Sequence, residues 1–164
     1  MSDFYTEQLI KKRTDGKDIA MKILLIAVTV ISFFIAFLMP FLLLLPVVFI
    51  AADIFLFRRM DVEYEYIYIN GDLDIDKVMH KEKRKHMLSM NVQDMELLAP
   101  EGSFQLQSYR TGKVYDYSSG DPAATGRYVL VFTRSGETVK VLFEPNRDLV
   151  EGFFLLAPRK VIRK

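Results

Sequence analysis

The sequence predicts an α+β membrane protein with an N-terminal two-helix transmembrane hairpin, followed by a curled antiparallel β-sheet domain that ends in an α-helix. Three observations predict this fold class. Residues 23–57 form a stretch of 35 residues in which Asp53 is the only charge. From residue 61 onward apolar and polar residues alternate, which is the period of half-buried strands. Between Asn146 and Pro158 the apolar residues recur at helical spacing.

The composition limits the class of protein. A chain of 164 residues suits one domain plus a membrane segment. The absence of Cys excludes a disulfide framework and thiolate metal sites. A net charge of +1 argues against a nucleic-acid partner, so any basic effect must be local.

The length of the apolar stretch favours two crossings over one. As one helix, its 35 residues would extend about 52 Å, whereas the hydrocarbon core is about 30 Å thick. Split at Met39-Pro40, each half spans about 26 Å. Pro40 removes a backbone donor and disfavours helix at the residue before it. We therefore expect a transmembrane hairpin over residues 23–57 with its turn near 39–41, and a kink at Pro46 in the second helix.

Basic residues flank the apolar stretch on both sides: Lys11, Lys12, Arg13, Lys17 and Lys22 before it, and Arg58 and Arg59 after it. Flanks rich in Lys and Arg stay cytoplasmic. A hairpin keeps both flanks inside, whereas a single span would place one of them outside. The sequence thus predicts a multi-pass protein of the cell (inner) membrane, with residues 1–22 as a cytoplasmic N-terminal segment and both termini cytoplasmic.

Asp53 is the one charge within the predicted hairpin, and an intramembrane ionisable residue is a candidate functional site. It lies five residues before Arg58, about 7 Å along a helix. In a hairpin folded about residue 40 it would sit near Ala27, about one turn from Lys22. We expect a structural ion pair between Asp53 and Lys22; a proton- or ion-handling role is the alternative.

The sheet domain begins with a clear hairpin signal. Asn70-Gly71 separates two alternating runs, and both positions of such a two-residue turn need positive φ. This register pairs Tyr68 with Leu73 and Tyr66 with Ile75. One face of the hairpin is then apolar and is expected to be core: Tyr64, Tyr66, Tyr68, Leu73 and Ile75.

The opposite face of this hairpin is acidic. It carries Glu63, Glu65, Asp72, Asp74 and Asp76. A calcium loop is not expected, because Lys77 stands where such a loop needs Gly. The basic run at residues 81–85 can neutralise the carboxylates from an adjacent strand, so we expect a charge-balanced, solvated face with no metal. His80 and His86 are interpreted as surface residues of the same polar stretch.

Further elements complete the domain, which spans residues 61–164. Ser135-Gly136 separates two more strands, and shorter strands are expected at 104–109 and 113–117. Residues 91–100 are interpreted as a helical turn or a strand. A C-terminal helix is expected over residues 146–157, capped by Asn146 and ended by Pro158.

Several short motifs are distributed along the chain: YTEQL (5–9), VEYEY (62–66), NGDLDIDK (70–77), DMELLAPEGS (94–103), DYSSG (116–120), FEPN (143–146) and APRKV (157–161). On these motifs the chain resembles an uncharacterised Firmicutes-type small membrane-protein family, domain of unknown function family 6106, with a bacterial pleckstrin-homology-like (PH-like) cytoplasmic domain. The resemblance implies a PH-like fold for residues 61–164. It implies no reaction, cofactor or catalytic residue.

The function expected from these features is a non-catalytic, membrane-anchored interaction module that binds a protein partner or an anionic lipid surface. There is no Cys nucleophile, no Ser in a recognisable elbow, and only two His, so no catalytic site or cofactor is predicted. The alternative is a small accessory subunit of a larger membrane complex, and an enzyme is the least favoured class. The residues expected to contact the membrane surface are Lys11, Lys12, Arg13, Arg58, Arg59, Arg159, Lys160, Arg163 and Lys164.

Overall fold

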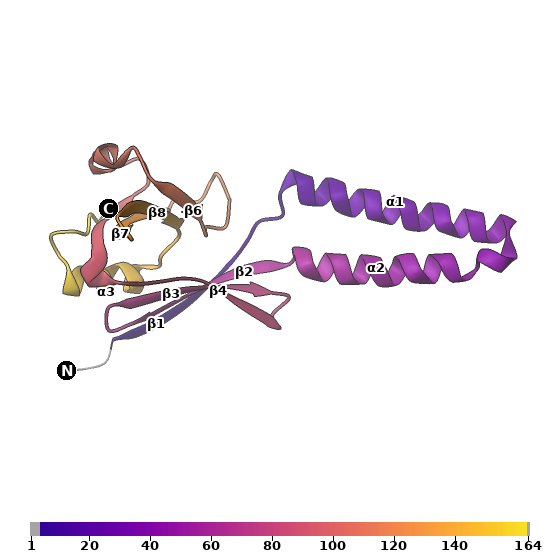
Figure 1. The fold of residues 1–164 in the computed structure, drawn as a ribbon, viewed down its shortest axis with the longest axis horizontal. Helices are drawn as coiled ribbons and strands as arrows, with labels where there is room; N and C mark the ends of the chain where they lie inside the picture. The colour runs from indigo at the N-terminus through magenta and orange to yellow at the C-terminus, as the bar shows by residue number, and fades with distance from the viewer. Residues whose placement is uncertain (1–3, 164) are drawn as a thin grey trace. The chain divides into compact units, whose positions relative to one another are not determined.

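The computed structural model describes residues 4–163, whose helices and strands are shown in Figure 1. The elements in chain order are β1 (Tyr5–Lys11), α1 (Gly16–Leu38), η1 (Pro40–Leu42), α2 (Leu44–Met60), β2 (Val62–Ile69), β3 (Asp72–Met79), β4 (Lys83–Asn91), η2 (Val92–Asp94), β5 (Met95–Pro100), η3 (Phe104–Tyr109), β6 (Lys113–Asp116), β7 (Tyr128–Arg134), β8 (Glu137–Phe143) and α3 (Arg147–Leu156), where η denotes a 3-10 helix.

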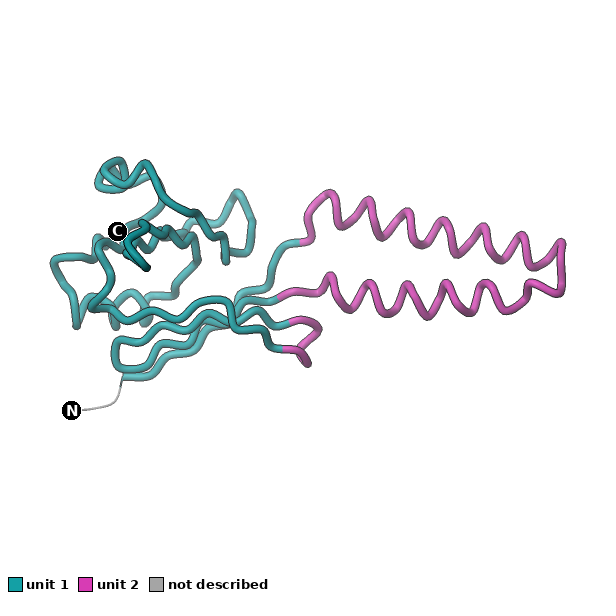
Figure 2. Tube along the Cα trace, in the orientation of Figure 1, with its two compact units in different colours: residues 1–13, 63–78, 84–164 teal, residues 14–62, 79–83 magenta. Residues whose placement is uncertain are grey.

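The chain forms two compact units, coloured separately in Figure 2. The helical unit comprises residues 14–62 together with the turn at 79–83. The sheet unit comprises the residues up to 13, residues 63–78 and the chain from 84 onward. The sheet unit is therefore discontinuous in sequence, because the chain leaves it after residue 13 and returns at residue 63.

Two antiparallel helices make up most of the helical unit. Asp15 caps α1 by accepting a hydrogen bond from the Gly16 N–H, 2.7 Å away, and Asp18 completes a capping box. The chain turns through η1, so the turn expected near residues 39–41 is confirmed. Because α2 begins at Leu44, Pro46 lies in its first turn, where backbone donors lack intrahelical acceptors and proline is tolerated. The sequence led us to expect a kink at Pro46 within the second helix, but a proline in the first turn requires no kink.

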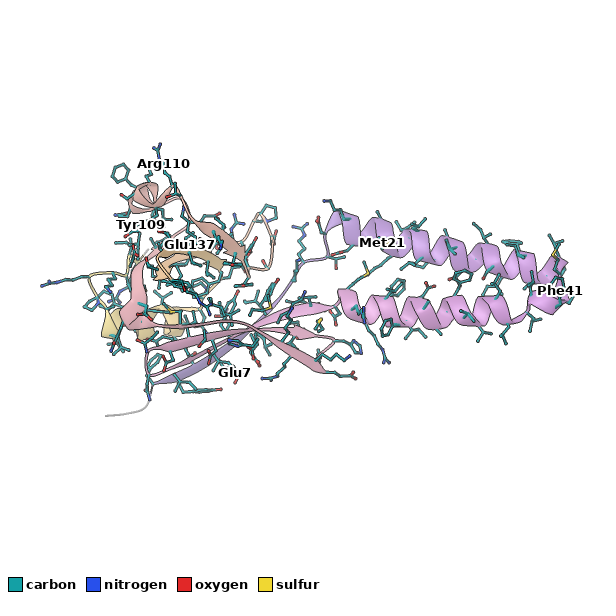
Figure 3. The ribbon with its side chains drawn as sticks, viewed as in Figure 1. Glu7, Met21, Phe41, Tyr109, Arg110 and Glu137 are labelled. Carbon is teal, nitrogen blue, oxygen red and sulfur yellow. The ribbon has the colours of Figure 1, made fainter. Side chains whose placement is uncertain are left out.

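Both helical segments are long and apolar enough to cross a membrane: α1 has 23 residues and Pro40–Met60 has 21. Few of their residues are buried, and large side chains such as Phe37 and Phe41 are more than four-fifths exposed, at 85% and 82%. Phe41 lies at the turn end of the helical pair (Figure 3). At about 1.5 Å per residue, α1 extends about 35 Å, which matches the hydrocarbon core of about 30 Å with a modest tilt.

The first sheet has the strand order β1-β2-β3-β4. Its central turn is the expected one, with positive φ at Asn70 (49°) and Gly71 (105°). The predicted core face is confirmed, since Tyr66, Tyr68 and Leu73 are fully buried. All five residues of that face are buried.

The first strand was not anticipated. Residues 5–11, expected to belong to a cytoplasmic N-terminal segment, pair antiparallel with β2 from Tyr5 opposite Ile69 to Lys11 opposite Glu63. The sheet domain expected to start at residue 61 therefore takes its first strand from before the helices. Since β1 and β2 are direct neighbours, the whole helical hairpin is an insertion between two paired strands.

The second sheet has the order β5-β7-β8-β6. The expected hairpin at Ser135-Gly136 joins β7 to β8, with φ values of 52° and 79°. Residues 91–100 contain both expected alternatives, η2 and then β5. The strand expected at 104–109 is wrong: those residues form the 3-10 helix η3. β6 confirms the strand expected at 113–117, but it pairs with β8 in parallel.

The C-terminal helix α3 packs on the sheets. Asn146 caps it as expected, accepting a hydrogen bond from the Leu149 N–H at 2.8 Å. Leu149 and Phe153 are fully buried, and the Phe153 ring centroid lies 4.7 Å from that of Tyr68. The Tyr68 hydroxyl donates to the Gly152 carbonyl at 3.0 Å. The helix therefore closes the core against β2.

Candidate functional site

A basic cavity of about 570 Å³ lies within the helical unit, where the last turn of α2 meets the turn between β3 and β4. It is lined by Phe55, Arg58, Arg59, Met79, His80, Glu82 and Lys83. We call these seven residues the basic pocket.

Local backbone structure places the two walls of the basic pocket together. Arg58 and Arg59 lie in the last turn of α2, where cations favour the negative end of the helix dipole. His80 has positive φ (50°), a conformation in which His is enriched among non-glycine residues. The His80 N–H donates to the Asp61 carbonyl at 2.9 Å, which ties the β3–β4 turn to the residue after α2.

The charge of the basic pocket is strongly unbalanced. It contains the cations Arg58, Arg59 and Lys83 against one carboxylate, Glu82. The Arg59 guanidinium lies over the Phe55 ring, 4.4 Å from its centroid. Among residues 4–163, no ion pair engages any of the three cations. An anion with several acceptor oxygens fits such a set, because guanidinium groups bind phosphate and carboxylate in a bidentate manner.

The sequence found only half of the basic pocket. Arg58 and Arg59 were expected to contact the membrane surface, and they line the cavity. His80 was interpreted as a surface residue. Lys83 was assigned to the basic run that neutralises the acidic face. No local sequence pattern places them beside α2, because the β3–β4 turn meets the end of that helix only in the folded chain.

The basic residues before α1 lie elsewhere. Lys11 ends β1, and Arg13 forms an ion pair with Asp121 at 2.6 Å. The Arg13 N–H also donates to the Ser119 carbonyl at 2.7 Å. These contacts fasten the end of β1 to the loop after β6, while Lys12 is exposed.

The C-terminal basic residues lie at the turn end of β2. Arg159 and Lys160 line a cavity of about 530 Å³ together with Asn70. Asn70 follows the last residue of β2, and Glu63 lies near its first. At about 3.3 Å per residue, the two are roughly 23 Å apart along the chain. Arg163 binds Glu151 at 2.7 Å and stacks on Phe154. Lys164 lies outside the described residues. Membrane contact by this tail stays a prediction.

The ion pair expected between Asp53 and Lys22 is not formed among the described residues. The Asp53 Oδ2 atom accepts a hydrogen bond from the Thr29 hydroxyl at 2.6 Å. The register of the two antiparallel helices places Asp53 beside Thr29, seven residues and about 10 Å beyond Lys22.

The basic run neutralises one carboxylate of the acidic face as expected, that of Glu65, but this carboxylate is buried and not solvated. Glu65 is only 1% exposed, and Arg84 lies 2.7 Å from its Oε2 and donates to its Oε1 at 3.0 Å. His86 lies 2.9 Å from Asp76. Burial raises the pKa of Glu65, against the lowering effect of Arg84, and nearby Glu7 raises it further. Glu7 is labelled on this sheet in Figure 3.

A comparison with known proteins gives a family. The family model described as bacterial PH-like domain (DUF6106) matches residues 2–163, so the chain belongs to this family. No curated protein and no solved structure gives a significant match.

Proposed function

We propose that this member of the bacterial PH-like domain family is a non-catalytic, membrane-anchored module, and that its basic pocket binds the phosphate of an anionic lipid headgroup. One observation carries the proposal: Arg58, Arg59 and Lys83 gather around one cavity without an ion-pair partner among the described residues. The apolar side chains of Phe55 and Met79 offer a surface for the glycerol and upper acyl chain.

The membrane anchor is supported by strand pairing. Lys11 is paired with Glu63, so the chain enters and leaves the helical hairpin at neighbouring positions of one sheet. Two paired strands must lie on the same side of a bilayer. The hairpin then crosses the membrane twice, and its basic flanks favour the cytoplasmic side for both ends. Arg58 and Arg59 end the second crossing, at the depth of the lipid phosphates.

The expected contribution of the basic pocket follows from its charge. Each Lys or Arg near an anionic surface stabilises binding by about 1 kcal/mol. Removing two of the three cations should therefore cost about 2 kcal/mol, or roughly thirtyfold in affinity.

The test is a titration of the detergent-solubilised full chain with short-chain phosphatidylglycerol and phosphatidylcholine, with bound lipid counted by native mass spectrometry. We expect a preference for phosphatidylglycerol that falls at least tenfold in the double variant Arg58→Gln/Lys83→Gln. The matched control is Arg110→Gln/Arg134→Gln, which removes the same charge at exposed positions of the sheet unit and should change affinity less than twofold. Equal losses in both variants, or no preference between the lipids, would contradict the proposal.

A second titration, with soluble glycerophosphate, distinguishes a lipid phosphate from a soluble phosphate compound. Weak binding of this probe supports a lipid ligand, because the apolar part of the pocket then contributes. Binding as tight as that of phosphatidylglycerol would assign the pocket to a soluble phosphate compound.

A protein partner is the second candidate, and a different feature favours it. On the outer face of the first sheet, Tyr5 and Ile69 lie opposite one another and are 57% and 44% exposed, and Leu9 on the same face is 54% exposed. Exposed apolar side chains gathered on one face mark protein interaction surfaces. Substituting Leu9→Asp should then release a co-purifying partner and leave lipid binding unchanged.

A further inference from the structure

A polar site lies between the two apolar helices. Asp53 on α2 accepts a hydrogen bond from the buried Thr29 hydroxyl on α1. The buried Ser32 hydroxyl donates to the Thr29 carbonyl at 2.6 Å, so it is satisfied within its own helix. Thr29 thus orients the carboxylate and leaves one of its oxygens available.

The Asp53 carboxylate has fewer polar partners than a charged group between apolar helices needs. Within residues 4–163 it has no second hydrogen bond and no cation within ion-pair distance. It is half-buried, and no other charge occurs between residues 23 and 57. The cost of an acidic side chain in a bilayer is several times the average stabilisation from one interhelical hydrogen bond. A second contact, with a cation, would offset the remaining cost of placing this carboxylate in a bilayer.

We propose that Asp53 is a docking site within the membrane for a partner transmembrane helix that carries a Lys or Arg side chain at the same depth. That depth is about 7 Å from Arg58, or one and a half helical turns. The inference rests on the proposed membrane-spanning hairpin and is independent of lipid binding by the basic pocket.

Charge complementarity selects this occupant over a second copy of the chain. The apolar segment of a second copy brings no Lys or Arg, and its only charge is another Asp53. Like charges disfavour each other in a low dielectric, so the cation must come from a different helix.

The experiment reconstitutes the full chain into phospholipid vesicles and measures energy transfer to synthetic peptides. The chain has no Cys, so the single variant Lys12→Cys takes the donor dye. The probes are Leu/Ala transmembrane peptides that differ only at one position, either Lys or Leu, about 7 Å from one end. We expect the Lys peptide to associate at least tenfold more strongly than the Leu peptide.

The matched variants separate charge from packing. Asp53→Asn keeps the size and polarity of the side chain and should bring the Lys peptide within twofold of the Leu peptide. Thr29→Val keeps the carboxylate and should retain the preference for Lys. A preference that survives in Asp53→Asn, or no preference at all, would overturn the inference. Transfer between two copies of the chain that Asp53→Asn abolishes would overturn it too, in favour of self-association.

A separate measurement detects failure of the hairpin to insert into the vesicles. An impermeant thiol reagent added to the same vesicles reports whether residue 12 and residue 81, in the variant Lys81→Cys, share one side. If they share a side and the Lys peptide still shows no preference, the docking inference alone fails.

Discussion

Replacing Gln8 with Ala should remove the link between β1 and the segment that leads into α3, and lower the free energy of unfolding of the sheet domain by about 1–3 kcal/mol. The Gln8 Nε2 group donates to the Glu144 carbonyl at 2.8 Å, and the Asn146 N–H donates to Gln8 Oε1 at 2.6 Å. One amide thus joins β1 to the segment that leads into α3. Each such hydrogen bond contributes about 0.5–1.5 kcal/mol, and its loss leaves partly buried backbone groups without partners.

The measurement is urea denaturation of the full chain in detergent micelles, followed by tyrosine fluorescence. All eight Tyr lie in the sheet unit and the chain has no Trp, so the signal reports on that unit alone. Thr6→Ala is the matched control on the same strand face, and it should cost no more than about 1 kcal/mol, the span of β-propensity. Gln8→Glu should also be destabilising at pH 7, because a carboxylate can accept from the Asn146 N–H but cannot donate to the Glu144 carbonyl. A loss at Gln8→Ala no larger than that at Thr6→Ala would refute the role of β1.

Two further predictions concern the core. Phe153→Ala should cost about 3–5 kcal/mol in the same assay, since the ring is fully buried, whereas Leu155→Ala, at a position 62% exposed, should change stability by about 0.5 kcal/mol or less. Burial raises the pKa of Tyr68 from its ordinary 10.0 to about 12 and also raises that of Tyr66. Their contribution to stability is therefore present below pH 10 and is lost as the pH rises toward 12, so the phenolate absorbance of these two buried residues should appear together with unfolding. The variant Tyr68→Phe separates the Tyr68 signal from that of exposed residues such as Tyr5 and Tyr115. Phenolate absorbance near pH 10 in the folded domain that Tyr68→Phe removes would contradict this assignment.

The parts of the fold that the sequence predicted are those with strong local signals. The two-residue turn needs positive φ at both positions, which few residues other than Asn and Gly tolerate. The Asn70-Gly71 pair therefore predicts both the turn and its register. Asn146 and Pro158 bound the last helix in a similar way. Pro40 within a long apolar stretch located the turn of the helical hairpin.

The parts that the sequence missed depend on distant partners. In β1 the inward side chains include Thr6 and Gln8, whereas Tyr5 and Leu9 face outward, so the hydrophobic pattern does not indicate a core strand. Its pairing comes from the free edge of β2, beyond the helical insertion. The basic pocket was missed for a similar reason, because the β3–β4 turn meets the end of α2 only through tertiary structure. The alternation at residues 104–109 was misleading, since Phe104 is 76% exposed in η3.

The insertion of a membrane hairpin between two paired strands is tested most directly by thiol accessibility in intact cells. The chain has no Cys, so each variant reports on one position. Lys12→Cys precedes the hairpin, and Lys81→Cys lies in the exposed turn after it. With a membrane-impermeant maleimide, both positions should be protected in intact cells and labelled once the membrane is opened. Labelling of only one of the two in intact cells would contradict both the double crossing and the pairing of β1 with β2.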